Sequence, residues 1–374
     1  MLRTGLVASL FLLAAQPSLA QDNHTSQQHD FKLVEVTNGL DHPWGMAFLP
    51  DGRILITERD TPALRLVEGG VLHPSPIAGL PDNMSTSGQG GLLDITLHPN
   101  FATNQVLYLS YAGKGDGGVG TEVLRARLVG HHLKDVETVF QVFPKTGGSA
   151  HYGSRLQFGA EGELYVTVGD RYSYMNEAQN PANHLGSILR LTDEGKAFKD
   201  NPFSDTVGKK PEIYTFGHRN PQGLTVRHTD GSLWAHEHGP RGGDEVNKLK
   251  AGANYGWPAI TYGIDYSGRT ISDKTHAAGM EQPVVYWDPS IAPSGMAFYK
   301  GDKFPNWQDD LFVGALAGQH LRRLEMEGDQ VVDQEVLLDE LARIRDVRNA
   351  PDGYLYILTD ESDGKLYRLE PSVQ

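Results

Sequence analysis

The residue types best suited to chemistry lie between Pro211 and Trp257, in the run PEIYTFGHRNPQGLTVRHTDGSLWAHEHGPRGGDEVNKLKAGANYGW. Two strand-forming runs in this segment end on polar side chains, and a Gly/Pro loop with two acids follows. Polar groups at strand ends cost free energy unless they meet a ligand or a metal. The segment therefore indicates an enzyme site. Its polar side chains are Arg219, Asn220, His236, Glu237, His238, Asp244 and Glu245.

The loop from Gly239 to Glu245 carries oxygen ligands of the kind that Ca²⁺ prefers. A Gly/Pro turn exposes backbone carbonyls, and carboxylates follow within a few residues. Taken alone, the loop fits a solvated acidic turn equally well. A zinc site at His236 and His238 is the other metal hypothesis, but the two histidines are spaced for one face of a strand. They lack the helical H-E-x-x-H spacing of zinc proteases.

The elements that must position these residues are repeated hairpins. Alternating apolar residues, a polar turn that usually contains Asp-Gly or Glu-Gly, and a second apolar strand recur along the chain. Such a pattern is typical of a β-hairpin, and six copies favour radial repetition because one hairpin cannot bury its face alone. We therefore predict an all-β six-bladed β-propeller. The copies are 44–59, 92–112, 154–171, 222–239, 294–316 and 344–361.

The ring is expected to close by pairing residues 31–37 with residues 365–371. In a propeller, equivalent positions of successive blades face the same axial cavity. Polar residues precede or open the first strand of four repeats, so we expect them to converge. They are Gln89, His151, Arg219 with Asn220, and Arg343 with Arg345. Arg155, on an inner strand, is expected to be a structural ion-pair partner.

Composition excludes several classes of protein. With a net charge of -14, the chain lacks the clustered cations that a nucleic-acid-binding surface needs. It has no cysteine, which excludes iron–sulfur clusters, zinc–thiolate sites and covalently attached haem. Electrons from any redox reaction must therefore leave for a separate carrier.

Residues 1–20 are predicted to be a secretory signal. Arg3 gives the positive start, an apolar core follows, and Ser18-Leu19-Ala20 is a small-x-small cleavage site. The apolar core is too short to span a bilayer. We expect residues 21–30 to be a loose polar leader and residues 31–374 to be the catalytic propeller, without a membrane span in the mature chain. The expected location is the periplasm.

The motifs GQGGLLDITLHPNF, GHRNPQGL and EHGPRGGDEVN resemble those of the soluble sugar dehydrogenases that use pyrroloquinoline quinone (PQQ), the glucose/sorbosone dehydrogenase type. Within that family the chain is most similar to the bacterial aldose sugar dehydrogenases. The resemblance covers nearly all of the mature chain, in the same order. It implies a six-bladed propeller with PQQ and Ca²⁺ at one end of the axis, and oxidation of aldoses to lactones.

The resemblance also implies roles for single residues. His151 would be the general base that takes the proton of the anomeric hydroxyl as hydride passes to the quinone C5. Arg219 would stabilise negative charge on the C5 oxygen. Gln89 and Asn220 would hydrogen-bond the cofactor or the sugar. Arg343 and Arg345 would bind PQQ carboxylates.

For the metal, the resemblance implies that the Gly239 and Pro240 carbonyls bind the Ca²⁺ that polarises the quinone. Glu245 and Tyr255 match family positions for a further Ca²⁺. Tyr266 and Ser290 would line the cofactor pocket. The electron acceptor would be an external quinone or cytochrome.

The chain departs from the family at three places near the expected site. Family members carry a lysine in a G-A-L-K segment at the cofactor, where this chain has Gly314, Ala315, Leu316 and Ala317. Arg322 or the Arg343/Arg345 pair would then compensate. Ala150 and Arg171 replace an aspartate and a glutamine of the glucose dehydrogenases, which favours a broad aldose range. The competing hypothesis is a Ca²⁺-dependent propeller lactonase or hydrolase, whose metal would be held mainly by side-chain Asp, Asn and Glu.

Overall fold

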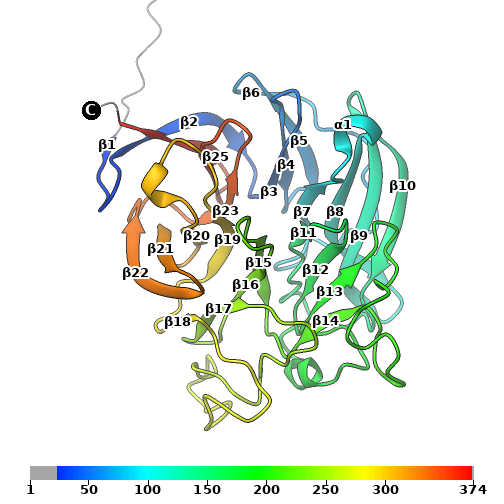
Figure 1. The fold of residues 1–374 in the computed structure, drawn as a ribbon. Coiled ribbons are helices and arrows are strands. Elements are labelled where there is room, and N and C mark those ends of the chain that lie inside the picture. The colour runs from blue at the N-terminus through cyan, green and yellow to red at the C-terminus, as the bar shows by residue number, and fades with distance from the viewer. Residues whose placement is uncertain (1–22, 373–374) are drawn as a thin grey trace, which may run out of the picture.

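The computed structural model describes residues 23–372. These residues form six antiparallel sheets arranged around one axis, which confirms the predicted all-β six-bladed propeller (Figure 1). The signal predicted over residues 1–20 lies outside the described residues. Within the described part of the chain, no helix is long and apolar enough to cross a membrane.

In blades 1 to 5, four strands follow one another in sequence order from the axis outward. Blade 6 has five strands, of which the outer two come from the start of the chain. Blade 1 is β3 (Pro43–Phe48), β4 (Ile54–Glu58), β5 (Ala63–Glu68) and β6 (Val71–Leu72). Blade 2 is β7 (Leu92–Leu97), β8 (Val106–Gly115), β9 (Gly118–Val129) and β10 (His132–Gln141). Blade 3 is β11 (Leu156–Phe158), β12 (Leu164–Val168), β13 (Ser187–Leu191) and β14 (Ile213–Phe216).

Blade 4 is β15 (Pro221–Val226), β16 (Leu233–Glu237), β17 (Asp244–Lys248) and β18 (Val285–Trp287). Blade 5 is β19 (Pro293–Phe298), β20 (Leu311–Ala315), β21 (Leu321–Glu327) and β22 (Gln330–Leu337). Blade 6 is β23 (Ile344–Asn349), β24 (Leu355–Thr359), β25 (Gly364–Pro371), β2 (Phe31–Leu40) and β1 (Asn23–His24). The short helices are α1 (Phe101–Asn104) and two 3₁₀ turns, Met175–Gln179 and Pro305–Trp307.

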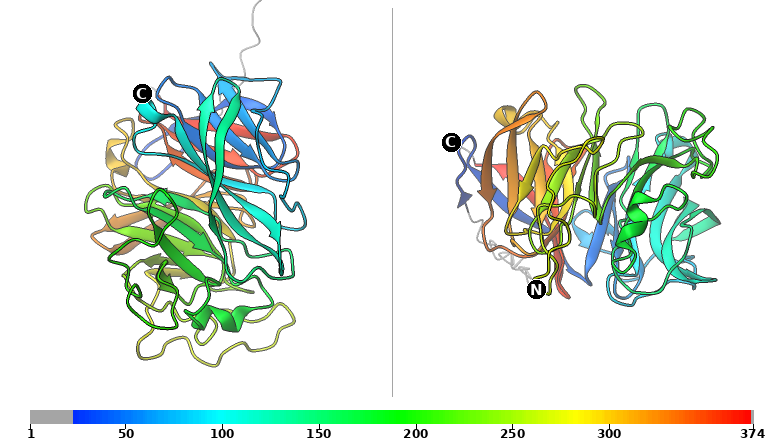
Figure 2. Two further views of the ribbon diagram at one scale, coloured as in Figure 1. Left: turned by 90° about the vertical axis from the view of Figure 1, so that its right-hand side faces the viewer. Right: turned by 90° about the horizontal axis from the view of Figure 1, so that it is seen from below.

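The predicted closure is confirmed. Strand β2, near the start of the chain, pairs with β25 at its end, in a register that joins Phe31 to Pro371 and Val34 to Arg368. Figure 2 shows the blue and red strands side by side in blade 6. Residues 23–30, expected to be a loose leader, instead contact blade 5, where Arg323 donates to the Gln27 side chain at 2.9 Å.

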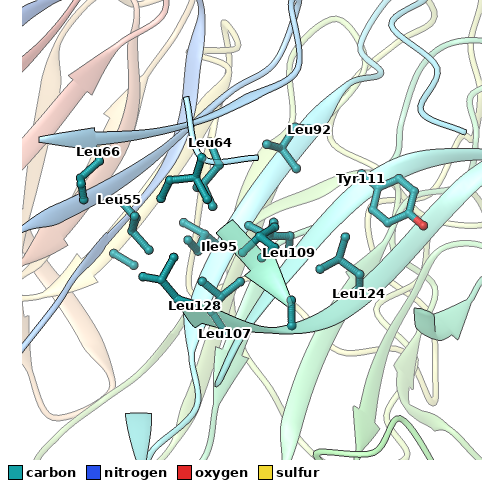
Figure 3. Close-up of a cluster of buried hydrophobic side chains, with 14 of the residues drawn as sticks. Leu55, Leu64, Leu66, Leu92, Ile95, Leu107, Leu109, Tyr111, Leu124 and Leu128 are labelled. Carbon is teal, nitrogen blue, oxygen red and sulfur yellow. The ribbon is translucent and has the colours of Figure 1, made fainter. Parts of the chain in front are cut away.

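Apolar side chains fill the spaces between neighbouring blades, because each sheet buries both faces. Between blades 1 and 2, buried residues of β3, β4, β5 and β7 to β10 form one leucine-rich layer (Figure 3). Burying a leucine of this kind contributes about 1.5–3 kcal/mol. The layer includes Leu55, Leu64, Leu66, Leu92, Ile95, Leu107, Leu109, Leu124 and Leu128.

Two pairs of opposite charges occupy the centre of the axial channel. The Arg155 guanidinium contacts Asp94 at 3.1 Å and Asp346 at 3.0 Å, which confirms its predicted structural role. Arg348 contacts the same two aspartates at 2.8 and 3.0 Å. Gly45 leaves room for this cluster, since a Cβ there would lie 2.6 Å from the Asp94 Oδ1 atom.

The inner strands are bulged close to their first residues. The register shifts between Pro43 and Gly45 in β3 and between Pro221 and Gly223 in β15. Similar shifts occur in β7, β19 and β23. A bulge bends the strand and redirects the side chains beside it. The polar residues just before these strands therefore lie outside the hydrogen-bonded sheets, at one end of the axis. We call this end the mouth.

Candidate functional site

His151 lies in the mouth, in the loop that leads into β11, and it is hydrogen-bonded to Asp170. Its Nδ1 atom is 2.6 Å from the Asp170 Oδ1 atom, and both side chains are buried. Trp257 donates its indole N–H to the other Asp170 oxygen at 2.7 Å. An aspartate acceptor at Nδ1 keeps the proton on that nitrogen, which leaves the Nε2 lone pair as the base.

The environment of His151 keeps its imidazole neutral. Burial is the largest effect and lowers the pKa of His151, and the Arg219 and Arg171 charges lower it further. The hydrogen bond to Asp170 acts in the opposite direction. A neutral imidazole with one free lone pair can accept a proton near pH 7.

Gln89 and Asn220 fix the loop that carries His151. Gln89 accepts the His151 backbone N–H through its side-chain oxygen at 2.8 Å, and its own N–H donates to Ser149 at the same distance. The Asn220 side-chain oxygen accepts the Gly153 N–H at 3.0 Å. These contacts matter because His151 has a φ of 54°, in the left-handed region that non-glycine residues avoid.

Arg219 enters the same mouth from the end of the loop before β15. Its guanidinium donates to the carbonyls of His238 and Gly239 at 3.0 and 2.6 Å. The Glu237 carboxylate accepts the Arg219 backbone N–H at 2.5 Å. The Arg219 side chain is buried, and it lies between the rings of Trp257 and Tyr266, 5.4 and 5.8 Å from their centroids.

Arg345 and Arg343 reach the mouth from blade 6. The Arg345 guanidinium is buried and donates to Asp360 at 2.5 Å and to the Gln222 side chain at 3.0 Å. Arg343 is more exposed and lies 3.6 Å from the same Asp360 carboxylate. Burial raises the pKa of the Asp360 carboxyl, but the charges of Arg345 and Arg59 and the hydrogen bonds from Arg345 and His42 hold it well below its usual range.

Three acids orient these groups; the sequence interpretation missed Asp170 and Asp360 as site residues and named Glu237 without a role. Asp170 follows β12, Glu237 ends β16, and Asp360 follows β24. Each therefore closes the second strand of its blade, at the end of the strand that returns to the mouth. An acid repeated at this position of the hairpin is a signal that the sequence does contain.

The predicted calcium loop lies at a small cavity of about 10 Å³, which is about the room that one water-sized sphere needs. The residues around it include Glu237, Gly239, Glu245 and Tyr255. Burial, and then the Glu237 charge, raise the pKa of Glu245. Two carboxylates that share a cavity favour a bound cation, so the donor set fits Ca²⁺.

The Tyr255 hydroxyl is already hydrogen-bonded within the blade. It donates to the Lys248 backbone carbonyl at 2.8 Å and accepts from the Lys250 backbone N–H at 2.9 Å. Tyr255 could therefore bind a cation only through its backbone carbonyl. Of the two histidines in the alternative zinc hypothesis, His238 is already hydrogen-bonded, since its Nε2 atom is 2.6 Å from the Pro293 carbonyl oxygen. His238 lies beyond the end of β16, and His236 lies within it.

The loop next to the cavity is held by Asp244 and Ser290. Asp244 accepts the backbone N–H groups of Gly239, Ile291 and Ala292 at 2.7–2.8 Å. The Ser290 hydroxyl accepts from Gly242 at 3.0 Å and donates to Pro240 at 3.3 Å. Ser290 thus fixes the Pro240 carbonyl, one of the predicted metal ligands.

The remaining predicted residues lie at the rim. Tyr266 is 58% exposed, and its hydroxyl is 3.5 Å from the Arg219 guanidinium. Ala315 and Leu316 are buried at the end of β20, and Ala317 is exposed. Arg343 donates to the Leu316 carbonyl at 3.3 Å, directly beside Ala317.

Arg322 was the other cation expected to compensate for the lysine missing at Ala317. Its guanidinium instead donates to His320 at 3.3 Å and to Gln334 at 3.2 Å, and it lies 5.7 Å from the Trp287 ring centroid. Of the two expected alternatives, Arg343 is the one that reaches the segment at Ala317.

Several buried donors near the mouth have no hydrogen-bond acceptor among the described residues. They include the Asn220 Nδ2, Arg171 Nε and Arg345 Nε atoms. Buried donors of this kind cost free energy unless a ligand accepts their hydrogen bonds. Donors beside several arginines suit a planar anion with carboxylates and carbonyls, so the residues present fit PQQ.

Comparison with known proteins gives one consistent result. Residues 40–368 match the family model Glucose / Sorbosone dehydrogenase. The aldose sugar dehydrogenase YliI of Escherichia coli (strain K12) is 46% identical over 339 residues, which are 89% of this chain and 91% of that protein.

Solved structures agree with this result. The apo-form of the soluble aldose sugar dehydrogenase from Escherichia coli has a TM-score of 0.86 at 43% identity and covers 91% of this chain and 100% of that one. The PQQ-bound aldose sugar dehydrogenase from Streptomyces coelicolor has a TM-score of 0.76 at 28% identity and covers 91% and 98%. The chain therefore belongs to the glucose/sorbosone dehydrogenase family and is an oxidoreductase.

Proposed function

We propose that this protein oxidises aldose sugars at the anomeric carbon to lactones, with PQQ and Ca²⁺, and passes the electrons to an external acceptor. The observation that carries the proposal is the His151–Asp170 pair beside the Arg219 guanidinium in one polar mouth. A base next to a cation is the arrangement that proton removal with charge stabilisation needs.

His151 takes the proton of the anomeric hydroxyl at its Nε2 atom. Asp170 holds the imidazole in the tautomer that leaves this atom free, and it stabilises the charge that the ring acquires. When bound, PQQ supplies the electron-poor quinone carbon that accepts the hydride. Electrons then leave through a quinone or cytochrome carrier, because the chain has no cysteine for an iron–sulfur cluster or covalent haem.

Arg219 provides positive charge for the oxygen on which negative charge develops. It is suited to this role because two carbonyls and the Glu237 contact at its backbone hold it in place before any ligand binds. Asn220 donates to the ligand through its free Nδ2 atom. Gln89 uses its side-chain oxygen on His151, so its amide nitrogen remains for the sugar or the cofactor.

The PQQ carboxylates would be held by Arg343 and Arg345, with Tyr266 and the Ala315–Ala317 segment at the rim. Ca²⁺ would take carbonyl oxygens from Gly239 and Pro240, and a further ion would take Glu245 and the Tyr255 carbonyl. All of these donors are oxygens, which favours Ca²⁺ over zinc. The polar mouth also carries more arginines than a lactonase metal site would use.

Reconstitution tests the proposal. Purified protein is stripped with EDTA, PQQ is added with and without Ca²⁺, and the absorbance spectrum and dye-coupled oxidation of several aldoses are recorded. Activity should require both additions. Full activity after exhaustive EDTA treatment, with metal shown absent by elemental analysis, would contradict the calcium part. Lactone hydrolysis without PQQ would establish the alternative, a Ca²⁺-dependent hydrolase.

The periplasmic location is also a proposal, and it rests on the signal predicted over residues 1–20. Amino-terminal sequencing of protein recovered from the periplasm of the producing cell tests it. A mature chain that begins near Gln21 would support export with cleavage. Retention of the full sequence in the cell pellet would contradict it.

A further inference from the structure

Arg171 is a buried cation beside the proposed base, and the proposed reaction does not use it. Its side chain is among the largest fully buried ones, at 1% exposure. Within residues 23–372, no carboxylate forms an ion pair with it. A buried charge without a paired carboxylate is expensive, and such groups occur mainly where they are needed.

The contacts of Arg171 are directed at the loop that ends in His151. Its guanidinium donates to the Gly148 carbonyl at 2.8 Å and also to the Ala150 carbonyl. The group lies 3.7 Å from the centroid of the Tyr152 ring, on the other side of His151 in the sequence. Arg171 thus contacts residues before and after the base. The sequence placed Arg171 near the expected site, and the structure buries its side chain beside the loop that carries His151.

The backbone at this turn is unusual. Arg171 and Tyr172 have φ values of 59° and 62°, two consecutive non-glycine residues in the left-handed region, and His151 across from them has 54°. Each such residue costs about 1–2 kcal/mol. Strain of this kind persists only where the surroundings impose it, and it is concentrated at functional sites.

Neighbouring residues of this turn contact different parts of the His151 loop. Asp170 contacts the His151 imidazole and also accepts the Tyr172 backbone N–H at 2.7 Å. Arg171 points into the interior and contacts the carbonyls of the His151 loop. The ring of His151 and its backbone are therefore fixed by adjacent residues of one turn.

We propose that Arg171 is a positioning residue, whose two-carbonyl contact holds residues 148–151 in the conformation that aims His151 at the substrate. The inference rests on the proposed function, because that function makes His151 the base. A planar guanidinium can bridge two carbonyls at once, whereas a lysine ammonium is a point charge on a flexible stem. The fork geometry, and not only the charge, should therefore matter.

The charge of Arg171 has a second, separable effect on the His151 ring. It lowers the pKa of His151, in the same direction as burial and Arg219 and against Asp170. Removing the charge should raise the pKa of His151, so the acid limb of the kcat/KM profile should move to higher pH. The groups that face His151 from the packed elements are Asp170, Arg171, Tyr172, Arg219 and His238.

Two variants separate the two-carbonyl contact of the guanidinium from its charge. Arg171→Lys keeps the charge but loses the planar group, and Arg171→Gln removes both. We expect kcat to fall about 10- to 100-fold in both, the loss that an ångström-scale displacement of a catalytic group produces. PQQ affinity, measured by titration of the cofactor-free protein, should stay within about threefold, because Arg171 is buried beneath the loop. Only Arg171→Gln should shift the acid limb.

The control is Arg323→Lys. Arg323 is also 1% exposed, but it pairs with Asp310 and Glu335 in blade 5. This change should lower stability and leave kcat and its pH profile unaltered. A general loss of packing would affect the control and the Arg171 variants alike, whereas positioning affects kcat in the Arg171 variants alone.

A measurement that needs no cofactor tests this inference separately from the proposed function. In protein labelled with ¹⁵N-histidine, the His151 signals are assigned by their absence in His151→Gln. We expect one sharp neutral tautomer in the wild type, and broadened or doubled signals in both Arg171 variants. This result can be obtained even if the protein fails to oxidise any aldose, which would overturn only the function.

Wild-type kcat in Arg171→Lys would show that charge alone suffices and would overturn the two-carbonyl contact. Wild-type His151 signals and wild-type kcat in Arg171→Gln would overturn any positioning role. Should Arg171→Gln fail to fold, Arg171→Lys and its histidine spectrum decide the question alone.

Discussion

The centre of the axial channel and its mouth are both rich in charge, but they are built differently. In the centre, Arg155 and Arg348 face Asp94 and Asp346, so two positive charges meet two negative ones. In the mouth, by contrast, Arg171 and Arg219 donate to backbone carbonyls and form no ion pair with a carboxylate of the described residues. Glu237 and Glu245 meet each other at one cavity there.

This difference separates a structural cluster from a binding site. Buried charges that pair with one another hold the inner parts of blades 2, 3 and 6 together. Buried arginines without a paired carboxylate leave a positive potential, which an anionic ligand neutralises. Buried donors without acceptors occur in both regions, on Asn220, Arg171 and Arg345 near the mouth and on Arg155 in the centre, so the pairing with carboxylates is what separates the two. The comparison predicts that mutations in the mouth reduce ligand binding or turnover, and that mutations in the centre reduce stability.

The largest effect should come from His151→Gln in the mouth. Loss of a general base reduces turnover by about 10² to 10⁴-fold. PQQ should still bind, because the arginines are untouched. Steady-state aldose oxidation at saturating cofactor measures the effect. His228→Gln, a partly exposed histidine in blade 4, serves as the control and should keep full turnover. Near-normal turnover in His151→Gln would remove His151 from the mechanism.

In the centre, Arg155→Met should act on stability instead. It leaves Asp94 and Asp346 to share one cation, and breaking a buried pair in this way costs about 3–5 kcal/mol. Urea unfolding followed by tryptophan fluorescence measures the loss. The control is Arg53→Met at an exposed ion pair with Asp51, where about 0–1 kcal/mol is expected. A large loss of turnover in folded Arg155→Met would mean that the centre also serves the reaction.

Arg345→Ala in the mouth should weaken PQQ binding severely. A charge-assisted hydrogen bond contributes about 1.5–3 kcal/mol, and the change also leaves Asp360 with a repelling negative charge near the ligand. PQQ titration into the cofactor-free variant measures the affinity. Arg127→Ala, at an exposed pair with Asp135, should bind PQQ normally. Unchanged affinity in Arg345→Ala would place the cofactor elsewhere.

Ala317→Lys should have the smallest effect and the opposite sign. It adds a cation at the exposed position where relatives carry a lysine, so PQQ should bind more tightly, by about 0.5–1.5 kcal/mol. Turnover should change little, because the contact is remote from the quinone C5. Ala102→Lys, on helix α1, adds the same charge at another exposed site. Equal affinities in the two variants would mean that Arg343, which contacts the Leu316 carbonyl, already fills this role.

The sequence was sufficient to predict the ring and its closure. The hairpins at 44–59 and 344–361 carry a period-two pattern around Asp-Gly turns, and both fold as the first two strands of a blade. The predicted pairing of residues 31–37 with residues 365–371 is confirmed. It could be predicted because an apolar edge strand needs a partner. These features depend on local patterns and on edges, which a sequence displays directly.

The partners inside the mouth were not predictable in the same way. The contact between His151 and Asp170 joins the loop before β11 to the residues after β12, and Trp257 reaches Asp170 from blade 4. Such contacts depend on how bulged strands direct their neighbours. The inward direction of the Arg171 side chain was not predictable for a further reason, because Arg171 has a left-handed backbone that its residue type does not favour.

The pairing of β2 with β25 also has a consequence for the order of events during folding. Strand β2 is synthesised early, but its partner β25 lies more than three hundred residues later in the chain. The two strands can therefore pair only after nearly the whole chain has been made. Closing so long a loop is slow and costs chain entropy. Arg345, which belongs to that last blade, reaches the mouth only once the blade exists. Until then the chain has exposed strand edges, so protection from aggregation should matter most just before the ring closes.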